Sequence, residues 1–252
     1  ESLSLENIKL EDQASRMAWL VSFIKGQQGT GIIYVLTKRT AETVADWLKQ
    51  NGIVAEPYYS GVKLPTHPET HSCREFLEKK LLTNEVDVLV ATVALGMGYD
   101  KPDLSFVVHF QCPGSIVGYY QQVGRAGRGI DKAIGILMSG SEDGDIHDFF
   151  RRTAFPDEQT VNRLLNQLSR GEGYSTRQLE GYFNMSQSKL QGILKFLSVE
   201  NPSPVTKQGT KWKRTPVVYE LDTDRIERLT NQRQLEWQEI QNYISTSDCL
   251  MT

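Results

Sequence analysis

Hydrophobic residues in the first part of the chain follow two alternating spacings. Residues 31–36 form a continuous apolar run (Gly-Ile-Ile-Tyr-Val-Leu), which is typical of a strand buried on both faces. Residues 44–48 then place apolar side chains at helical spacing, with Thr40 as a candidate N-terminal cap and Asn51-Gly52 as the end of the helix. The first spacing therefore predicts a strand of a buried sheet, and the second predicts a helix that covers it.

The same alternation continues to about residue 140. It predicts strands over residues 53–58, 87–91, 106–110 and 133–138, and helices over residues 69–82 and 115–123. Strands that alternate with helices are joined by right-handed crossovers and form a largely parallel sheet with helices on both sides. We therefore predict an α/β lobe over residues 1–150.

A different pattern follows residue 140. Residues 142–148 are acidic and contain a glycine, so they predict a connector, and Phe149-Phe150 are expected to pack it down. The remaining pattern predicts three short helices over residues 158–170, 176–183 and 186–198. It then predicts a hairpin around Gly209, formed by residues 205–214 and 216–221, and a long polar helix over residues 224–244. Three compact helices followed by a hairpin are typical of a winged helix-turn-helix, which we place at residues 151–222, ahead of a C-terminal helix in residues 223–252.

Composition narrows the class of protein only slightly. The net charge of -3 gives no overall signature of nucleic-acid binding, so any such site must be a local patch. The three cysteines are far apart and odd in number, which argues against a disulfide framework and for a reducing compartment. Because no apolar run approaches the ~18 residues of a membrane span, we expect a soluble intracellular protein without a membrane partner.

The most informative motif is the run Q-x-x-G-R-x-G-R at residues 121–128. Its arginines, Arg125 and Arg128, are three residues apart, a spacing that places two side chains on one face of a helical turn. Paired guanidinium groups suit a triphosphate, because each can bind phosphate oxygens with two hydrogen bonds and never loses its charge. A solvated basic helix end is the alternative, which Gln121 and the two glycines of the motif make less favourable.

A second motif follows the predicted strand at residues 87–91. The Thr92 hydroxyl and nearby amides at the carboxyl end of this strand can bind a backbone phosphate, and Asp100 can accept a hydrogen bond from a ribose hydroxyl. Gly96 and Gly98 allow the chain to turn sharply beside a ligand. Taken alone, the motif would favour a glycine-containing strand-helix turn with a capping aspartate over a ligand site.

Together these motifs resemble a known family. Residues 90–110 and 119–128 resemble motifs V and VI of superfamily 2 helicases, and within them the bacterial RecQ DNA helicases. Residues 34–39 resemble motif IV, and residues 58–61 the element after it. The resemblance covers essentially the whole chain, and it implies a second RecA-like lobe with a parallel sheet flanked by helices, followed by the winged helix.

The resemblance assigns roles to individual residues. It implies that Arg125 and Arg128 contact the γ-phosphate of ATP, with Arg128 as the arginine finger, and that Gln121 couples the nucleotide state to the lobe interface. Asp100, Lys101, Gly98 and Gly124 would line the nucleotide side. The backbone of single-stranded DNA would be held by Thr92, Ser60, Gly61, Thr37 and Arg39.

The implied activity is that of an ATP-dependent 3′–5′ DNA helicase of DNA repair and recombination in the bacterial cytoplasm, associated with the nucleoid. The sequence contains neither G-x-x-x-x-G-K-[ST] nor D-E-x-H, the motifs that hold phosphates and Mg²⁺. In the family these motifs lie in a first lobe, which would precede Glu1 and bind most of the ATP and Mg²⁺. We therefore expect a fragment that hydrolyses almost nothing alone. The rival hypotheses are a winged-helix regulator without ATPase activity and a superfamily 2 RNA helicase.

The predicted hairpin is rich in cations. Lys207, Lys211, Lys213 and Arg214 can neutralise DNA phosphates, and Trp212 can stack on a base or open a duplex end. These residues predict contacts with duplex or forked DNA. The alternative is a soluble turn in which Trp212 folds onto the core of its own domain.

Ser188 and Lys189 open the third helix of the winged-helix region with polar groups suited to DNA phosphates. An ordinary helix start with a serine cap explains the same residues equally well.

Metal-ligating residues are sparse. Cys249 matches the first zinc cysteine of the RecQ family, which makes Zn²⁺ possible in a longer protein, but a structural zinc site needs four ligands. We therefore interpret Cys249 as a free thiol in this chain. His67 and His71 are four residues apart without a third ligand, a pattern that indicates a surface loop.

Overall fold

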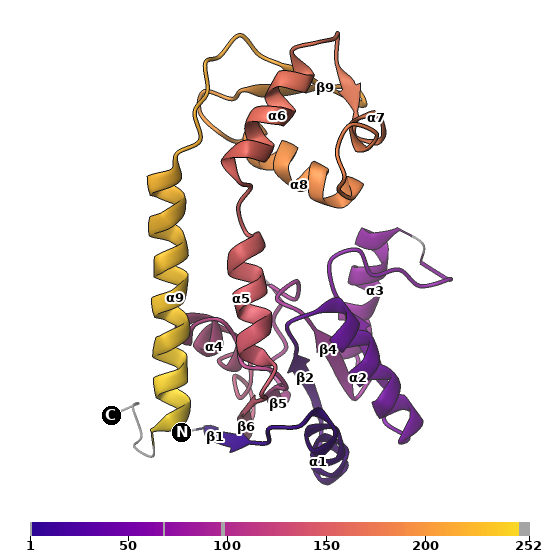
Figure 1. Ribbon diagram of the computed structural model, residues 1–252. Helices are drawn as coiled ribbons and strands as arrows, with labels where there is room; N and C mark the ends of the chain where they lie inside the picture. The colour runs from indigo at the N-terminus through magenta and orange to yellow at the C-terminus, as the bar shows by residue number, and fades with distance from the viewer. Residues whose placement is uncertain (1, 68, 97–98, 247–252) are drawn as a thin grey trace. The chain divides into compact units, whose positions relative to one another are not determined.

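The computed structural model describes residues 2–67, 69–96 and 99–246 of the chain (Figure 1). The chain divides into two compact units. The first unit contains the residues up to His147 together with those from Leu235 onward, and the second contains residues 148–234. Within the described ranges, no helix is both long and apolar enough to cross a membrane.

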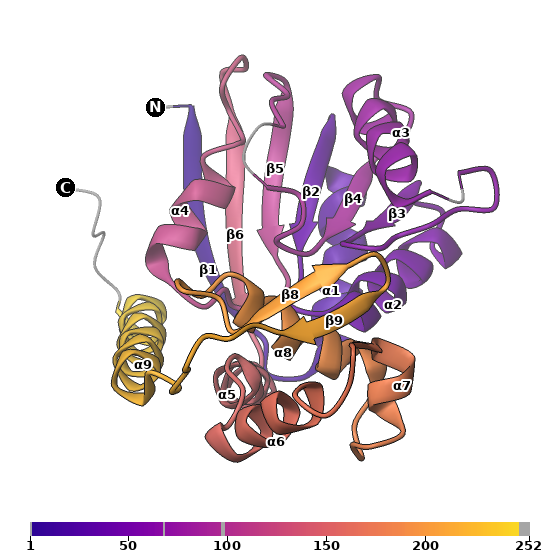
Figure 2. The same cartoon turned by 90° about the horizontal axis from the view of Figure 1, so that it is seen from above.

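The first unit is built on a parallel six-stranded sheet (Figure 2). From edge to edge its strands are β1 (Leu3–Lys9), β6 (Ala133–Ser139), β5 (Leu104–His109), β2 (Thr30–Tyr34), β4 (Val88–Ala91) and β3 (Ala55–Tyr58). Every neighbouring pair is parallel, which confirms the predicted sheet. Strand β1 was not predicted, because at the sheet edge it lacks the continuous burial that marks β2.

Helices cover both faces of this sheet. On one face α1 (Gln13–Gly26) and α2 (Lys38–Gln50) pack on residues such as Ile33. On the other face α3 (Thr70–Leu82), α4 (Ile116–Val123) and the last turns of α9 (Thr223–Ser245) pack on residues such as Ile32. Neighbouring residues of β2 thus serve opposite layers, as the alternation of side chains along a strand requires.

The start of α2 differs from the prediction. The helix begins at Lys38, and its cap is Thr37, whose Oγ1 accepts a hydrogen bond from the Thr40 backbone N–H at 3.1 Å. Thr37 has the extended backbone that a capping residue needs, whereas Thr40 lies inside the helix. The predicted end is confirmed, since Asn51 caps the helix and Gly52 follows with a φ of +81°.

The prediction of an acidic connector over residues 142–148 is wrong. Residues Asp143–Thr153 form helix α5, with Asp143 and Asp145 in its first turn. Acidic side chains stabilise a helix N-terminus, so the acidic run marks a helix start rather than a loop. Phe149 is 56% exposed and Phe150 is 40% exposed, so they do not pack the segment down.

Three helices and a small antiparallel sheet lie wholly within the second unit, which also includes the end of α5 and the first turns of α9. They are α6 (Glu158–Leu168), α7 (Thr176–Glu180), α8 (Gln187–Ser198) and the strands β7 (Tyr174–Ser175), β9 (Lys211–Arg214) and β8 (Val205–Gln208), in that sheet order. The hairpin β8–β9 turns at Gly209, which has a φ of +60°. The sequence predicted a strand over residues 216–221, but the structure has none there. The strand that pairs with β9, besides β8, is β7.

Candidate functional site

Residues of the Q-x-x-G-R-x-G-R motif line a pocket of about 370 Å³ at the end of α4. The helix begins at the Ser115 cap, whose Oγ accepts from Gly118 N at 3.1 Å, and it ends at Val123. The two arginines therefore follow the helix instead of sharing one of its faces. The pocket is lined by Gln121, Gly124, Arg125 and Arg128 of the motif, and by Tyr99, Asp100 and Tyr120.

Arg128 is the accessible guanidinium of this pocket. Its Nε donates to the Gly124 carbonyl oxygen at 3.2 Å, and its Nη1 donates to Asp100 Oδ1 at 3.0 Å. The side chains of Arg128 and Asp100 are 51% and 61% exposed, so water screens the pair and it contributes at most ~1 kcal/mol. An incoming anion can displace Asp100 from Arg128 at small cost.

Arg125 has a different environment. Its residue is 8% exposed, and its Nη1 donates to the Tyr99 carbonyl oxygen at 3.0 Å. The guanidinium also lies beside the Tyr34 phenol, whose pKa is raised to about 12 by burial, an effect that the nearby Arg125 opposes. Arg125 thus joins the chain after α4 to the loop after β4 and also lines the pocket, so its contact with the γ-phosphate stays a prediction.

Lys101 does not line the pocket, which corrects its predicted place on the nucleotide side. The residue is 2% exposed, and its Nζ donates to Asn84 Oδ1 and Asp103 Oδ1, both at 2.8 Å. Its charge and hydrogen bonds hold the pKa of Asp103 below the usual range. Gly98, the other predicted residue of this loop, lies outside the described residues.

The residues predicted to hold single-stranded DNA follow three adjacent strands. Thr37 and Arg39 come after β2, Thr92 after β4, and Ser60 and Gly61 after β3. Because the strands are parallel and adjacent, these segments emerge at the same edge of the sheet. Ser60, Gly61 and Arg39 are exposed, Thr92 is 9% exposed, and the hydroxyl of Thr37 serves the α2 cap.

Lys38 belongs to the same edge, although sequence reasoning missed it. Its Nζ lies 5.5 Å from the centroid of the Tyr59 ring, and a side chain at Gly61 would meet this Nζ at 3.6 Å. Gly61 has a φ of +93°, so the turn after β3 favours glycine. The signal that could have revealed Lys38 is its place in the first turn of α2, beside Arg39.

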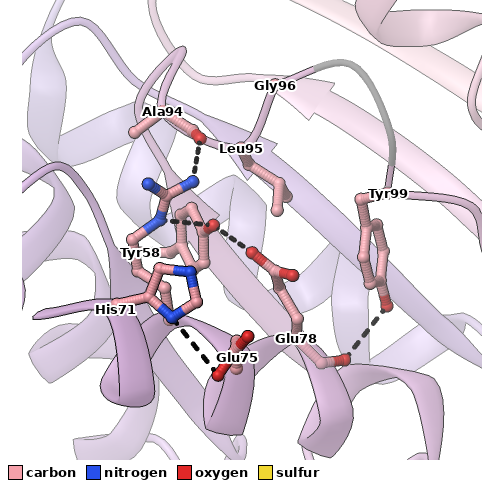
Figure 3. Close-up of a pocket in the computed structure, with 9 residues that line it drawn as sticks. Tyr58, His71, Glu75, Glu78, Ala94, Leu95, Gly96 and Tyr99 are labelled. Carbon is pink, nitrogen blue, oxygen red and sulfur yellow. Dashed lines mark hydrogen bonds and ion pairs between the residues drawn. The ribbon is translucent and has the colours of Figure 1, made fainter.

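A second pocket, of about 320 Å³, lies between α3 and the loop after β4 (Figure 3). Arg74 Nε donates to Tyr58 Oη at 2.8 Å, and Arg74 Nη2 donates to the Ala94 carbonyl oxygen at 3.0 Å. Tyr58 Oη in turn donates to Glu78, and Tyr99 Oη donates to the Glu78 carbonyl oxygen at 3.4 Å. No sequence pattern marked Arg74, because a single arginine in a charged helix carries no signal of its own.

The hairpin presents fewer cations than predicted. Lys207 and Lys211 are exposed, but Trp212 is 4% exposed and packs in the core of the second unit. Trp212 is therefore unavailable to a base, which corrects its predicted DNA contact. Lys213 and Arg214 are half-buried, and Arg214 Nη1 donates to the Pro204 carbonyl oxygen at 2.7 Å.

Ser188 and Lys189 are exposed in the first turn of α8. The cap of this helix is Ser186, whose Oγ accepts from Lys189 N at 3.3 Å. The side chains of Ser188 and Lys189 are therefore presented to solvent ahead of the buried face that begins at Leu190.

The described part of the chain contains no group of three or more His, Cys, Asp or Glu side chains that could hold a metal ion. His67 stacks on Phe76 with ring centroids 4.0 Å apart, and His71 Nδ1 lies 3.4 Å from Glu75 Oε2. Cys73 and Cys112 are buried thiols, whereas Cys249 lies outside the described residues. The residues that the structure describes do not fit a zinc site.

Comparison with known proteins relates the chain to helicases. The family described as helicase conserved C-terminal domain matches residues 15–129. The RecQ-like DNA helicase blm-1 of Caenorhabditis elegans is 42% identical over 99 residues, which are 39% of this chain and 9% of that protein. The ATP-dependent DNA helicase RecQ of Pasteurella multocida is 39% identical over 120 residues, which are 47% of this chain and 18% of that protein.

A longer match extends into the second unit. The ATP-dependent helicase wrn-1 of Caenorhabditis elegans is 32% identical over 188 residues, which are 74% of this chain and 16% of that protein. The chain thus spans less than a fifth of the length of these three relatives.

Proposed function

We propose that this chain is part of a RecQ-type helicase of superfamily 2, an ATP-dependent DNA helicase to which it supplies the second RecA-like lobe and a winged-helix domain. The observation that carries the proposal is the pocket that joins Arg128, Asp100 and Gln121. A role in repair and recombination, in the cytoplasm at the nucleoid, is part of the same proposal.

The pocket provides half of an ATPase site. Arg128 binds the γ-phosphate, because its exposed guanidinium keeps its charge and can exchange Asp100 for phosphate oxygens. Asp100, once released, accepts from the ribose, and Gln121 at the rim senses the nucleotide state. Mg²⁺ would neutralise the charge on the phosphates in such enzymes; the one carboxylate that lines this pocket, Asp100, is paired with Arg128 and is assigned here to the ribose, so the proposal gives it no part in holding Mg²⁺. Mg²⁺ and most of the nucleotide therefore belong to the first lobe.

The carboxyl edge of β2, β4 and β3 is the proposed path of the DNA strand. Exposed Ser60, Gly61 and Arg39 provide a hydroxyl, backbone groups and a cation to successive phosphates. Lys38 adds a second cation beside the helix N-terminus, a position that favours anions. Lys38 is an addition to the DNA contacts that the sequence predicted.

The second unit is proposed to be the winged helix. Three helices and an antiparallel sheet with a hairpin are the elements of that fold, with α8 as the third helix. Ser188 and Lys189 on α8, together with Lys207 and Lys211 on the hairpin, are the exposed polar groups proposed to contact duplex phosphates. Trp212 does not take part, because it is a core residue.

An ATPase assay tests the proposal on a protein that carries this chain together with the ATP-binding lobe. DNA should stimulate hydrolysis, and Arg128→Ala should lower the stimulated rate by about 10³-fold or more, the usual effect of losing an arginine finger. Lys132→Ala, which removes an exposed cation outside the pocket, is the matched control and should retain the rate.

The assay also separates the rival functions. Stimulation by RNA in place of DNA would make the protein an RNA helicase. Full activity of Arg128→Ala would refute the arginine-finger role, and a lack of any ATPase activity would leave a DNA-binding module.

A further inference from the structure

The loop after β4 connects the two proposed sites. It begins at Thr92, at the edge proposed for DNA, and reaches Asp100, which lines the proposed nucleotide pocket. Two arginines from different elements each donate to one main-chain carbonyl of this loop. Arg74 Nη2 lies 3.0 Å from the Ala94 oxygen, and Arg125 Nη1 lies 3.0 Å from the Tyr99 oxygen. The loop is therefore fixed near both ends.

Arg74 is itself held rigidly. Its Nε donates to Tyr58 Oη at 2.8 Å, and its guanidinium carbon lies 5.2 Å from the centroid of the Tyr58 ring. Tyr58 is 0% exposed and donates onward to Glu78, one turn further along α3 than Arg74. Because each guanidinium bond has a fixed direction, the two acceptors Tyr58 Oη and Ala94 O determine the orientation of Arg74.

Helix α3 also supports the nucleotide end of the loop. Tyr99 Oη donates to the Glu78 carbonyl oxygen at 3.4 Å, and Figure 3 shows Glu78 between Tyr58 and Tyr99. The same helix thus contacts Ala94 through Arg74 and Tyr99 through its main chain. Helix α3 therefore links the Tyr99 end of the loop, which Arg125 also contacts, to the Ala94 carbonyl that Arg74 holds.

We propose that Arg74 is a positioning residue that couples the nucleotide pocket to the DNA edge by anchoring the Ala94 carbonyl. The inference rests on the proposed function. It requires that nucleotide changes the affinity for DNA through the contacts of α3 with Tyr99 and Ala94, and by linkage DNA changes the affinity for nucleotide by the same factor. Arg74 touches neither ligand, so its loss should reduce the coupling and spare each binding site.

The test measures DNA affinity with and without a non-hydrolysable ATP analogue, on a protein that carries both lobes. The ratio of the two dissociation constants for single-stranded DNA is the coupling factor, typically ~5–150-fold. Arg74→Ala should bring this ratio below about threefold, while kcat at saturating DNA stays within about threefold of wild type. Arg74→Lys can reach one of the two acceptors and should retain an intermediate ratio. Lys79→Ala, an exposed cation on the same helix, is the control and should retain the full ratio.

Three results would overturn the inference. A wild-type ratio in Arg74→Ala would show that Arg74 serves only the fold, even if the unfolding midpoint falls. If Arg74→Ala does not fold, Tyr58→Phe replaces it, since it removes the hydroxyl that orients Arg74, and full coupling there would refute the role. A wild-type protein without any nucleotide effect on DNA binding would overturn the proposed function, and this inference with it.

Discussion

Two arginines of one motif illustrate how local environment decides what a residue does. The spacing of Arg125 and Arg128 suggested equivalent phosphate ligands, but α4 ends at Val123 and Gly127 takes a φ of +74°. The chain therefore leaves the helical path before it reaches the second arginine. Arg125 becomes buried against a main-chain carbonyl, while Arg128 stays at the rim of the pocket. The exposure of the two side chains therefore differs, which their spacing alone could not predict.

This difference predicts opposite effects of two alanine variants on stability. Arg125→Ala should lower the free energy of unfolding by about 1–3 kcal/mol, because it removes a part-buried hydrogen bond from a charged donor to the Tyr99 carbonyl. Arg128→Ala should change it by less than about 1 kcal/mol, because its ion pair is exposed. Urea unfolding followed by circular dichroism measures both. Equal losses in the two variants would contradict the distinction.

A second residue-scale prediction concerns His109. The ring is 0% exposed and its Nε2 lies 2.7 Å from Gln122 Oε1; burial lowers the pKa of His109 from 6.5 to about 4. The unfolded chain therefore binds a proton at a pH where the folded chain does not. The stabilisation is complete above pH 6.5 and is lost as the pH falls toward 4, by an amount on the order of 3 kcal/mol.

Unfolding free energies of wild type and His109→Gln across this pH range test that prediction. The difference between the two proteins isolates His109 from Asp143, whose pKa burial raises to about 6 and whose effect on stability has the opposite sign. If the unfolding free energies of the two proteins changed in parallel with pH, His109 would not contribute to the pH dependence of stability.

At the scale of elements, hydrophobic spacing predicted the strands and helices with buried faces and missed the strands that are mostly exposed. Strands β2, β4 and β5 were predicted because they are buried on both faces, and α8 because its apolar residues recur at helical spacing. The exposed edge strand β1 and the two-residue strand β7 carry too few buried positions to leave a pattern. The acidic start of α5 was misinterpreted, because charge at a helix N-terminus resembles a loop in composition.

The hairpin β8–β9 gives a prediction at the same scale. Trp212 on β9 packs in the core of the second unit, so Trp212→Ala should destabilise that unit by about 3–5 kcal/mol through the cavity it leaves. Amide hydrogen exchange in α6 and α8, measured against Lys211→Ala on the same strand, reports the loss. If Trp212→Ala left the protection of these amides from exchange unchanged, Trp212 would not be a core residue, and its predicted contact with DNA would stand again.

At the scale of the whole molecule, the candidate sites depend on the fold more than on composition. The net charge of -3 conceals local groups of cations, and the residues at the carboxyl edge of the sheet are far apart in sequence. Motifs after β2, β3 and β4 predicted Thr37, Ser60 and Thr92 one by one, and the parallel topology explains why their segments share an edge. Arg74 could not be predicted, since only the packed lobe gives it partners, whereas Lys38 had a signal in its place beside Arg39 that was missed.

Salt dependence of DNA binding distinguishes a local cation that contacts phosphate from one that merely adds charge. If Lys207 and Lys211 each neutralise one phosphate of a forked DNA, each alanine variant should reduce the slope of log K against log salt by about 0.9, and the double variant by about 1.8. Lys195→Ala removes an exposed lysine of α8 and should leave the slope unchanged. Fluorescence anisotropy between ~50 and ~200 mM salt measures these slopes. Because the overall charge falls by the same amount in each single variant, equal slopes for Lys211→Ala and Lys195→Ala would mean that the hairpin attracts DNA only through net charge. The duplex contact would then have to lie elsewhere.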